Sequence, residues 1–210
     1  MEMLDITPVN WTSPDSIIKV IGVGGGGCNA VNYMYKQNIE GCTFIVCNTD
    51  AQALNKCEVP IKIQLGEGLG AGTNPTEGRN AALNSQDDIA EKVLDDKTEM
   101  LFITAGMGGG TGTGAAPVIA AMAKKKGILT VGVVTIPFRN QGPEAMSKAL
   151  DGISELEKNV DSLLIIDNEK LFGVYGDLLI QQAFPKADEV LATAVRGITE
   201  IIKKRGYVNV

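Results

Sequence analysis

The placement of the 25 glycines is the feature that most constrains how this chain can fold. Three dense clusters span residues 22–27, 66–72 and 106–114, and each falls in a connection after a predicted strand. Glycine loses more backbone entropy on ordering than any other residue, so such clusters suit places where a ligand or another segment approaches the backbone closely. The sequence therefore predicts glycine-rich connections that face a ligand.

Short apolar runs rich in β-branched residues alternate with helix-length stretches along the chain. Such runs suit strands that are buried on both faces of a parallel sheet. The alternation predicts an α/β fold, a doubly wound, mostly parallel sheet with helices on both faces. Ligands of such folds bind at the carboxyl ends of the strands. We expect strands at 17–23, 44–47, 100–104, 129–136 and 163–166, and helices at 115–126, 143–159 and 187–205.

Composition excludes several classes of function. The net charge of −6 disfavours nucleic-acid binding, which needs basic patches. The chain has no histidine, which removes Ser-His and Cys-His catalysis and most zinc chemistry. Its four cysteines lack C-x-x-C spacing and indicate free thiols in a reducing compartment. No signal peptide or membrane-spanning stretch is visible, so we expect a cytoplasmic location without direct membrane insertion.

The first glycine cluster fits the pattern G-x-G-x-x-G between a predicted strand and a helix expected to start near Asn29, and Asp50 follows near the end of the next predicted strand. This pattern resembles a dinucleotide-binding fingerprint, in which a helix N-terminus binds phosphate. An NAD-dependent Rossmann oxidoreductase is therefore one alternative. A second glycine-rich phosphate-binding segment is not needed by such a domain, and no hydride-transfer partner is obvious.

The third cluster, 106–114, follows a predicted strand and precedes the helix expected to start at Ala115. It is not a Walker A loop, because no Gly-Lys-Ser/Thr sequence follows. The hydroxyls of Thr111 and Thr113 could add donors to phosphate oxygens. The second cluster could close over a terminal phosphate and sense its presence.

Five ordered segments give the chain a specific resemblance. The string GGGTGTG at 108–114 resembles the signature of the FtsZ family of tubulin-like bacterial cell-division GTPases, and the resemblance covers nearly the whole chain. It implies a filament-forming, cytoskeletal GTP-binding protein that takes part in septation. The matching segments are IGVGGGGCNAVN at 21–32, NTDAQAL at 48–54, GLGAGTNP at 68–75, TAGMGGGTGTGAAPVIA at 104–120 and VVTIPF at 133–138.

The resemblance also implies a set of nucleotide-binding residues, with GTP or GDP as the ligand and Mg²⁺ accompanying GTP. Phosphate contacts would come from the three clusters, Asp50 could reach the metal through water, and Asn168, Asp188 and a stacking Phe184 would recognise guanine. A carboxylate suits guanine, because guanine offers two adjacent N–H donors where adenine offers an acceptor and no 2-amino group. The implied residues are Gly25, Gly26, Gly27, Asn29, Asn48, Asp50, Gly70, Ala71, Gly72, Gly108, Gly109, Gly110, Thr111, Gly112, Thr135, Gln141, Asn168, Phe184 and Asp188.

The chain departs from the family pattern in two places. Gln141 and Ala145 stand where the family has a Glu and an Arg that contact ribose and phosphate. Loss of a charge-assisted contact costs about 1.5–3 kcal/mol, so we expect weaker nucleotide binding than in a typical relative. The family's catalytic loop, N-x-D-F-A-D, is represented only by Asn209, so we expect a polypeptide of these 210 residues to be nearly inactive in GTP hydrolysis.

The expected organisation is a flexible N-terminal segment at 1–16, a GTP-binding domain at 17–186, and a long central helix with the truncated start of the catalytic loop at 187–210. In the full-length protein the resemblance implies head-to-tail self-association at the division site and contacts with other cell-division proteins. We expect the 210-residue polypeptide to be a monomer. A scaffold that has lost nucleotide binding remains a further alternative, because of Gln141 and Ala145.

Overall fold

Six parallel strands form a single sheet with the order β3-β2-β1-β4-β5-β6 in this computed structural model, which describes residues 16–170 and 180–203, with side chains at 16–170 and 185–197. Every neighbouring pair of strands is parallel, as the alternation of strands and helices predicted. The strands are β1 (Ile18–Val23), β2 (Thr43–Asn48), β3 (Ile61–Gln64), β4 (Met100–Gly106), β5 (Leu129–Ile136) and β6 (Ser162–Asp167).

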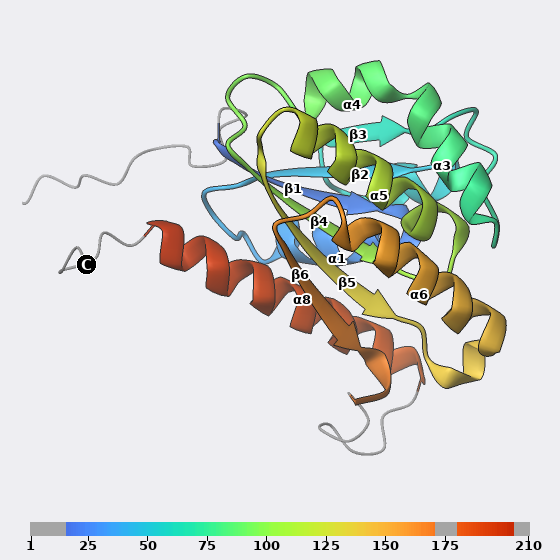
Figure 1. Cartoon of the computed structure of the whole chain (residues 1–210). Helices are drawn as coiled ribbons and strands as arrows, with labels where there is room; N and C mark the ends of the chain where they lie inside the picture. The colour runs from blue at the N-terminus through green and yellow to red at the C-terminus, as the bar shows by residue number, and fades with distance from the viewer. Residues whose placement is uncertain (1–15, 171–179, 204–210) are drawn as a thin grey trace, which may run out of the picture.

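Helices cover both faces of the sheet (Figure 1). In the described ranges they are α1 (Gly24–Lys36), α2 (Ala51–Lys56), α3 (Pro75–Asn84), α4 (Gln86–Lys92), α5 (Gly110–Lys125), the 3₁₀ turn η1 (Arg139–Gln141), α6 (Pro143–Glu157) and α8 (Ile180–Lys203). None of these helices is long and apolar enough to cross a membrane.

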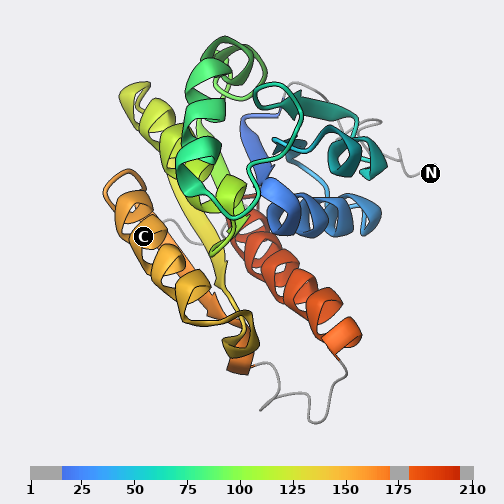
Figure 2. The same ribbon diagram turned by 90° about the vertical axis from the view of Figure 1, so that its right-hand side faces the viewer.

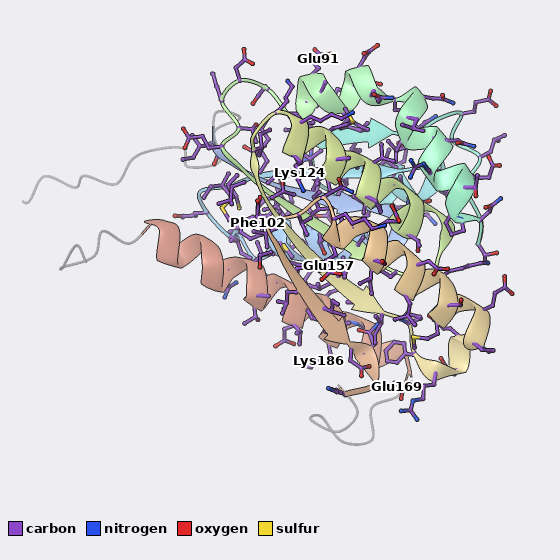
Figure 3. All side chains as sticks on the ribbon, viewed as in Figure 1. Glu91, Phe102, Lys124, Glu157, Glu169 and Lys186 are labelled. Atoms are coloured by element: carbon purple, nitrogen blue, oxygen red, sulfur yellow. The ribbon has the colours of Figure 1, made fainter. Side chains whose placement is uncertain are left out.

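The core consists of two layers separated by the sheet. Successive side chains of a strand point to opposite faces. Val20 accordingly packs with Met34 of α1 and Val195 of α8, whereas its neighbour Ile21 packs with Ile119 of α5. Figure 3 shows Phe102 in the interior and Glu91 pointing outward from α4. Because strands buried on both faces need helices on both, this packing confirms the predicted doubly wound α/β class.

The strand order reverses between β1 and β4. The chain runs outward from β1 through β2 to β3, then returns to β4 and runs outward through β5 to β6. The strand arrows point to the right in Figure 1, and Figure 2 looks toward that carboxyl edge. In open α/β sheets this reversal leaves a crevice where ligands bind. The first and third glycine clusters follow the two strands at the reversal.

Three predicted helix starts were wrong, two of them because the glycine clusters at 22–27 and 106–114 were interpreted as loops. The helices begin at Gly24 instead of Asn29, at Gly110 instead of Ala115, and at Ile180 instead of Ala187. Glycine has low intrinsic helix propensity, but tertiary packing overrides propensity. An added Cβ at Gly112 would collide with the carbonyl oxygen of Gly106. The short strand β3 and helices α2, α3 and α4 were not predicted.

Candidate functional site

The first and third glycine clusters lie side by side at the reversal. Val23 at the end of β1 is paired in register with Ala105 of β4. A Cβ on Gly24 would lie 2.9 Å from the backbone nitrogen of Gly112, and one on Gly26 would lie 3.3 Å from the Cα of Gly106. Glycine is therefore required for the two backbones to approach each other, and the helices α1 and α5 begin next to one another.

The helices that follow the two central strands have no side-chain cap. The N-cap residues of α1 and α5 are Val23 and Gly109, and neither provides a side-chain hydrogen bond to the first turn. By contrast, Asp50 caps α2 and Asn74 caps α3 with side-chain oxygens. First-turn N–H groups and the positive end of the helix dipole bind anions. The N-termini of α1 and α5 can therefore still bind an anion, whereas N-cap side chains already accept hydrogen bonds from the first turns of α2 and α3.

Open space surrounds one glycine of each cluster. A Cβ added at Gly25, Gly72 or Gly109 would meet no other atom within 4 Å, and all three residues are exposed. These positions differ from the tightly packed glycines nearby, where the protein's own backbone already fills the space. The backbone at these three positions is therefore open to an incoming ligand.

The second cluster packs directly on the start of α5. The Gly110 N–H donates to the carbonyl oxygen of Gly72 at 3.0 Å. An added Cβ at Gly110 would lie 2.8 Å from each of the carbonyl oxygens of Ala71, Gly72 and Asn74. Gly110 is therefore the contact point between the loop at 66–72 and the third cluster. The structure brings all three predicted clusters to the same edge of the sheet.

Thr49 joins these segments, and the sequence analysis did not single it out. Its hydroxyl oxygen lies 2.6 Å from that of Thr111 and accepts a hydrogen bond from the Ala71 N–H at 2.9 Å. Its carbonyl oxygen accepts from the Gly70 N–H at 2.8 Å. Its place in the segment NTDAQAL at 48–54 was the available signal, but the threonine type alone does not reveal these partners.

The threonine hydroxyls of the third cluster have internal partners. Thr111 pairs with Thr49, and the Thr113 hydroxyl accepts the Gly108 N–H at 2.9 Å. Thr113 is 4% exposed. These hydroxyls therefore hold the loops in place, and the Thr113 hydroxyl, which accepts in this contact, keeps its own hydrogen as a donor.

Asn48 and Asp50 form a small polar group at the end of β2. Asn48 is 3% exposed, and its Oδ1 accepts from the Asp50 N–H at 3.3 Å. The Asp50 Oδ1 accepts from the N–H groups of Gln52 and Ala53 at 2.9 and 3.0 Å. The residues described here contain no cluster of three acidic, Cys or His side chains that could hold a metal ion. A metal near Asp50 would thus depend on ligand oxygens and water.

The predicted base-binding residues lie at the other end of this edge. Asn168 follows β6 and is 6% exposed, and its Oδ1 has no hydrogen-bond partner. An unsatisfied buried acceptor costs about 1–3 kcal/mol, so a donor from a ligand would relieve a real penalty. Asp188 lies on α8, where burial raises the pKa of its carboxyl to about 7. Both groups suit a ligand that offers N–H donors.

The remaining predicted residues occupy more ordinary places. Asn29 is exposed on α1, and Gln141 is exposed in η1. Thr135 is buried in β5, where its carbonyl oxygen accepts the Met107 N–H at 2.9 Å. Glu169, just past β6 in Figure 3, accepts the Arg139 N–H at 2.7 Å and tethers η1.

The side chain of Phe184 and the whole of Asn209 lie outside the described residues, as does the predicted N-terminal segment except for Ser16.

The departure from the family pattern packs against the third cluster. A Cβ on Gly108 would lie 3.0 Å from the carbonyl oxygen of Ala145, and Gly108 has a φ of +100°. The backbone of Ala145 therefore lies beside the third cluster, at a position where the family pattern has an Arg. Its methyl group has no charge or donor to offer there.

Comparison with known proteins agrees with this geometry. The family model described as "Tubulin/FtsZ family, GTPase domain" matches residues 17–176. A cell division protein FtsZ from Porphyromonas gingivalis is 54% identical over an alignment of 210 positions, which covers 96% of this chain and 46% of that protein. Its counterpart from Pseudomonas aeruginosa is 56% identical over 200 residues, covering 93% of this chain and 50% of that protein.

A solved structure described as an empty FtsZ dimer from M. jannaschii superposes with a TM-score of 0.86 at 44% identity. That superposition covers 92% of this chain and 57% of the other. The chain spans about half the length of the curated relatives it matches. The match over most of the chain, together with the paired glycine-rich helix starts, shows that it belongs to the Tubulin/FtsZ family.

Proposed function

We propose that this chain binds GTP or GDP at the carboxyl edge of its sheet. The observation that carries the proposal is the pair of uncapped helix N-termini, α1 and α5, on adjacent central strands. With a net charge of −6, the protein needs backbone N–H groups in place of lysines to bind phosphate. Membership of a GTPase-domain family makes a guanine nucleotide the matching ligand.

The phosphates would lie among the three clusters. Gly25, Gly26 and Gly27 at the start of α1 would bind the α- and β-phosphates, and residues 108–112 would bind them from the other side. The segment 70–72, held to α5 through Gly110, would meet the γ-phosphate. Mg²⁺ would arrive with GTP and neutralise phosphate charge, with Asp50 reaching it through water.

The guanine would lie beside Asn168 and Asp188. The unpartnered Oδ1 of Asn168 can accept one ligand N–H, and the ionised carboxylate of Asp188 can accept the two adjacent donors of guanine. Adenine would leave that carboxylate unpaired. Discrimination of this kind rests on buried polar groups that the wrong ligand fails to satisfy. Phe184 would stack on the base.

Hydrolysis and assembly belong to a longer protein in this proposal. The curated relatives are named cell division proteins, and one solved relative is a dimer. The full-length protein would stack head to tail at the division site in the cytoplasm, with GTP hydrolysed where subunits meet. A polypeptide of residues 1–210 carries only Asn209 of the acidic loop, so it would bind nucleotide as a monomer and hydrolyse GTP very slowly.

Direct titration tests the binding proposal. The purified chain would first be treated with acid to release and identify bound nucleotide, then titrated calorimetrically with GDP, GTP, ATP and NAD. We expect guanine-specific binding without appreciable turnover. Binding of NAD in preference to GTP would favour the oxidoreductase alternative, and no binding at all would favour the scaffold.

A matched pair of variants sharpens that experiment. Gly109→Asp adds a carboxylate at the N-cap of α5, where space is open and Asp is a favourable cap. The variant should fold normally and bind GDP at least tenfold more weakly, because its carboxylate competes with phosphate. Gly197→Asp on α8, also open, is the control and should bind like the natural chain. Equal GDP affinity in both variants would refute the placement of the phosphates.

The assembly proposal has its own test. The chain would be added to a full-length relative that polymerises, and light scattering would follow filament growth. A polypeptide that keeps the nucleotide face but lacks the opposite face should cap filaments at one end and reduce the signal. Scattering that does not change over a range of added chain would contradict the proposal.

A further inference from the structure

A cavity of about 680 Å³ lies at the amino edge of the sheet, where β2 and β3 begin, at the opposite edge from the glycine clusters. The end of α1 and the connection from α1 to β2 form one side, and the segment before β3 forms the other. Among its lining residues Ile39 and Phe44 are buried, whereas Tyr35 and Ile61 are half-buried. Binding cavities typically measure about 300–1,000 Å³ and are mainly apolar, so this cavity has the size and lining of a docking groove. We call it the amino-edge groove.

Contacts within the protein set the width of the amino-edge groove. The Lys36 ammonium lies 2.7 Å from the Glu58 carboxylate, and the Asn32 Oδ1 accepts the Glu58 N–H at 2.7 Å. Both contacts join α1 to the segment before β3. The rings of Tyr35 and Phe44 pack edge to face with their centroids 6.3 Å apart. Aromatic rings pack favourably on one another in such arrangements, so the groove suits an aromatic side chain.

The described part of the chain begins beside this groove. The Ser16 hydroxyl donates to the carbonyl oxygen of Gly41 at 2.9 Å and accepts the Ile18 N–H at 3.2 Å. Gly41 directly precedes Cys42, one of the lining residues. Residues 1–15 are therefore attached to the protein next to the groove.

The sequence of residues 1–15 supplies a matching side chain. It contains Trp11, the one tryptophan of the chain, and it has no Lys or Arg. A tryptophan buries about 150–250 Å² when it packs against apolar groups. Pro8 and Pro14 favour extended backbone at the residue before each of them, which reduces the entropy lost on docking. The five positions from Trp11 to Ser16 span up to about 17 Å, enough to reach a groove that begins beside Gly41.

We propose that residues 8–14 dock in the amino-edge groove, with the Trp11 indole as the anchor between Tyr35 and Ile61. A segment tethered beside its site has an effective concentration in the millimolar range, which favours it over a second copy of the chain or a separate partner. Asn38, exposed at the rim, offers an amide oxygen to the indole N–H. The proposal differs from the expectation that 1–16 is flexible, and it does not depend on nucleotide binding.

Fluorescence of the full chain tests the proposal. Because Trp11 is the one tryptophan, indole emission reports on this contact alone. We expect the native protein to emit at shorter wavelength than the same protein in concentrated urea. Acrylamide should quench the native emission more weakly, since the groove shields the indole from water and quencher. Both properties should stay constant on dilution, because a contact within one chain does not depend on protein concentration.

A matched pair of variants locates the contact. Ile61→Asp places a carboxylate in one wall of the groove, and should shift the emission and the quenching to the values of the unfolded chain. Leu150→Asp is the control, because Leu150 is 58% exposed on α6 and does not line the groove, and it should behave like the natural chain. Tyr35→Ser repeats the test from α1, so the result does not depend on one variant. Circular dichroism would verify that each variant folds.

Three results would overturn the proposal. Native emission and quenching equal to those of the unfolded chain would show that Trp11 does not dock. A blue-shifted emission that persists in folded Ile61→Asp and Tyr35→Ser would place the indole elsewhere. A blue shift that disappears on dilution would mean that the groove receives the segment of a second copy.

Discussion

The hydroxyl oxygens of Thr49 and Thr111 lie 2.6 Å apart, although 62 positions separate the two residues in the chain. Thr49 follows β2, and Thr111 lies in the first turn of α5 after β4. Because the Thr49 hydroxyl also accepts the Ala71 N–H, one side chain connects the second glycine cluster to the third. The geometry of the candidate phosphate site depends on this connection.

Replacing Thr49 by valine should destabilise the chain by about 1–3 kcal/mol. Valine keeps the branched shape but leaves the buried Ala71 N–H and the Thr111 hydroxyl without their partner. Urea denaturation monitored by circular dichroism would measure the change in unfolding free energy. Thr73→Val, at an exposed position in the same region, is the control and should change stability by less than about 0.5 kcal/mol. Equal changes in the unfolding free energy of Thr49→Val and Thr73→Val would show that the Thr49–Thr111 pair does not hold the two glycine clusters together.

Adjacent glycines in the third cluster should respond oppositely to alanine. Gly110→Ala would push its methyl group to 2.8 Å from three carbonyl oxygens and should cost about 1–3 kcal/mol of stability. Gly109→Ala meets open space and should leave the melting temperature nearly unchanged. Thermal denaturation of both variants without nucleotide makes the comparison. A stable Gly110→Ala protein would mean that the loop at 71–74 moves away at little cost.

Removal of the Asn168 side chain should reduce the gain in stability on nucleotide binding. Asn168→Ala eliminates a buried acceptor that no protein group satisfies, so the nucleotide-free protein loses little hydrogen-bond energy. If that acceptor receives a guanine N–H, GDP affinity should fall about tenfold, or about 1.4 kcal/mol. The shift of melting temperature with added GDP would show this. An unchanged shift would place the base elsewhere.

Stability should depend on pH through Asp188. Its pKa is raised from 3.8 to about 7, so the folded state holds a proton that the unfolded state releases. The associated stability is fully present below about pH 4 and is lost as pH rises through 7. Asp188→Asn should therefore flatten the fall in stability between pH 5 and pH 8, whereas Asp151→Asn, at an exposed site on α6, should not. Parallel pH profiles for all three proteins would refute this.

Nucleotide affinity should show the opposite trend with pH. Guanine donors favour the ionised carboxylate, so GDP binding should strengthen as pH rises from 6 to 8 and should release a proton. Calorimetry in buffers of different ionisation enthalpy would count that proton. Asp188→Asn should bind GDP without proton release, and proton release that persists in this variant would assign the linkage to another group.

Local pattern predicted much of the architecture. The apolar runs located β1, β2, β4, β5 and β6, because strands buried on both faces must be apolar throughout. It missed β3, whose run IKIQ alternates apolar and polar residues and whose first two residues are half-buried. The helix starts within the glycine clusters were also missed. Glycine is needed at those positions because two backbone segments approach each other closely. A residue's helix propensity carries no information about such contacts between distant segments.

The sequence by itself determined that the first and third glycine clusters meet at the carboxyl edge, because each directly follows a predicted strand and parallel strands end at one edge. The strand before the second cluster, β3, was found only in the structure. Its motifs also identified the family. Only the tertiary structure decided how the segments are joined: Thr49 to Thr111 and Ala71, and Gly110 against Gly72. Such contacts link residues far apart in the chain, and their geometry depends on the register and packing of the whole sheet. A threonine in the sequence carries no signal that distinguishes a ligand-binding side chain from one that joins two segments.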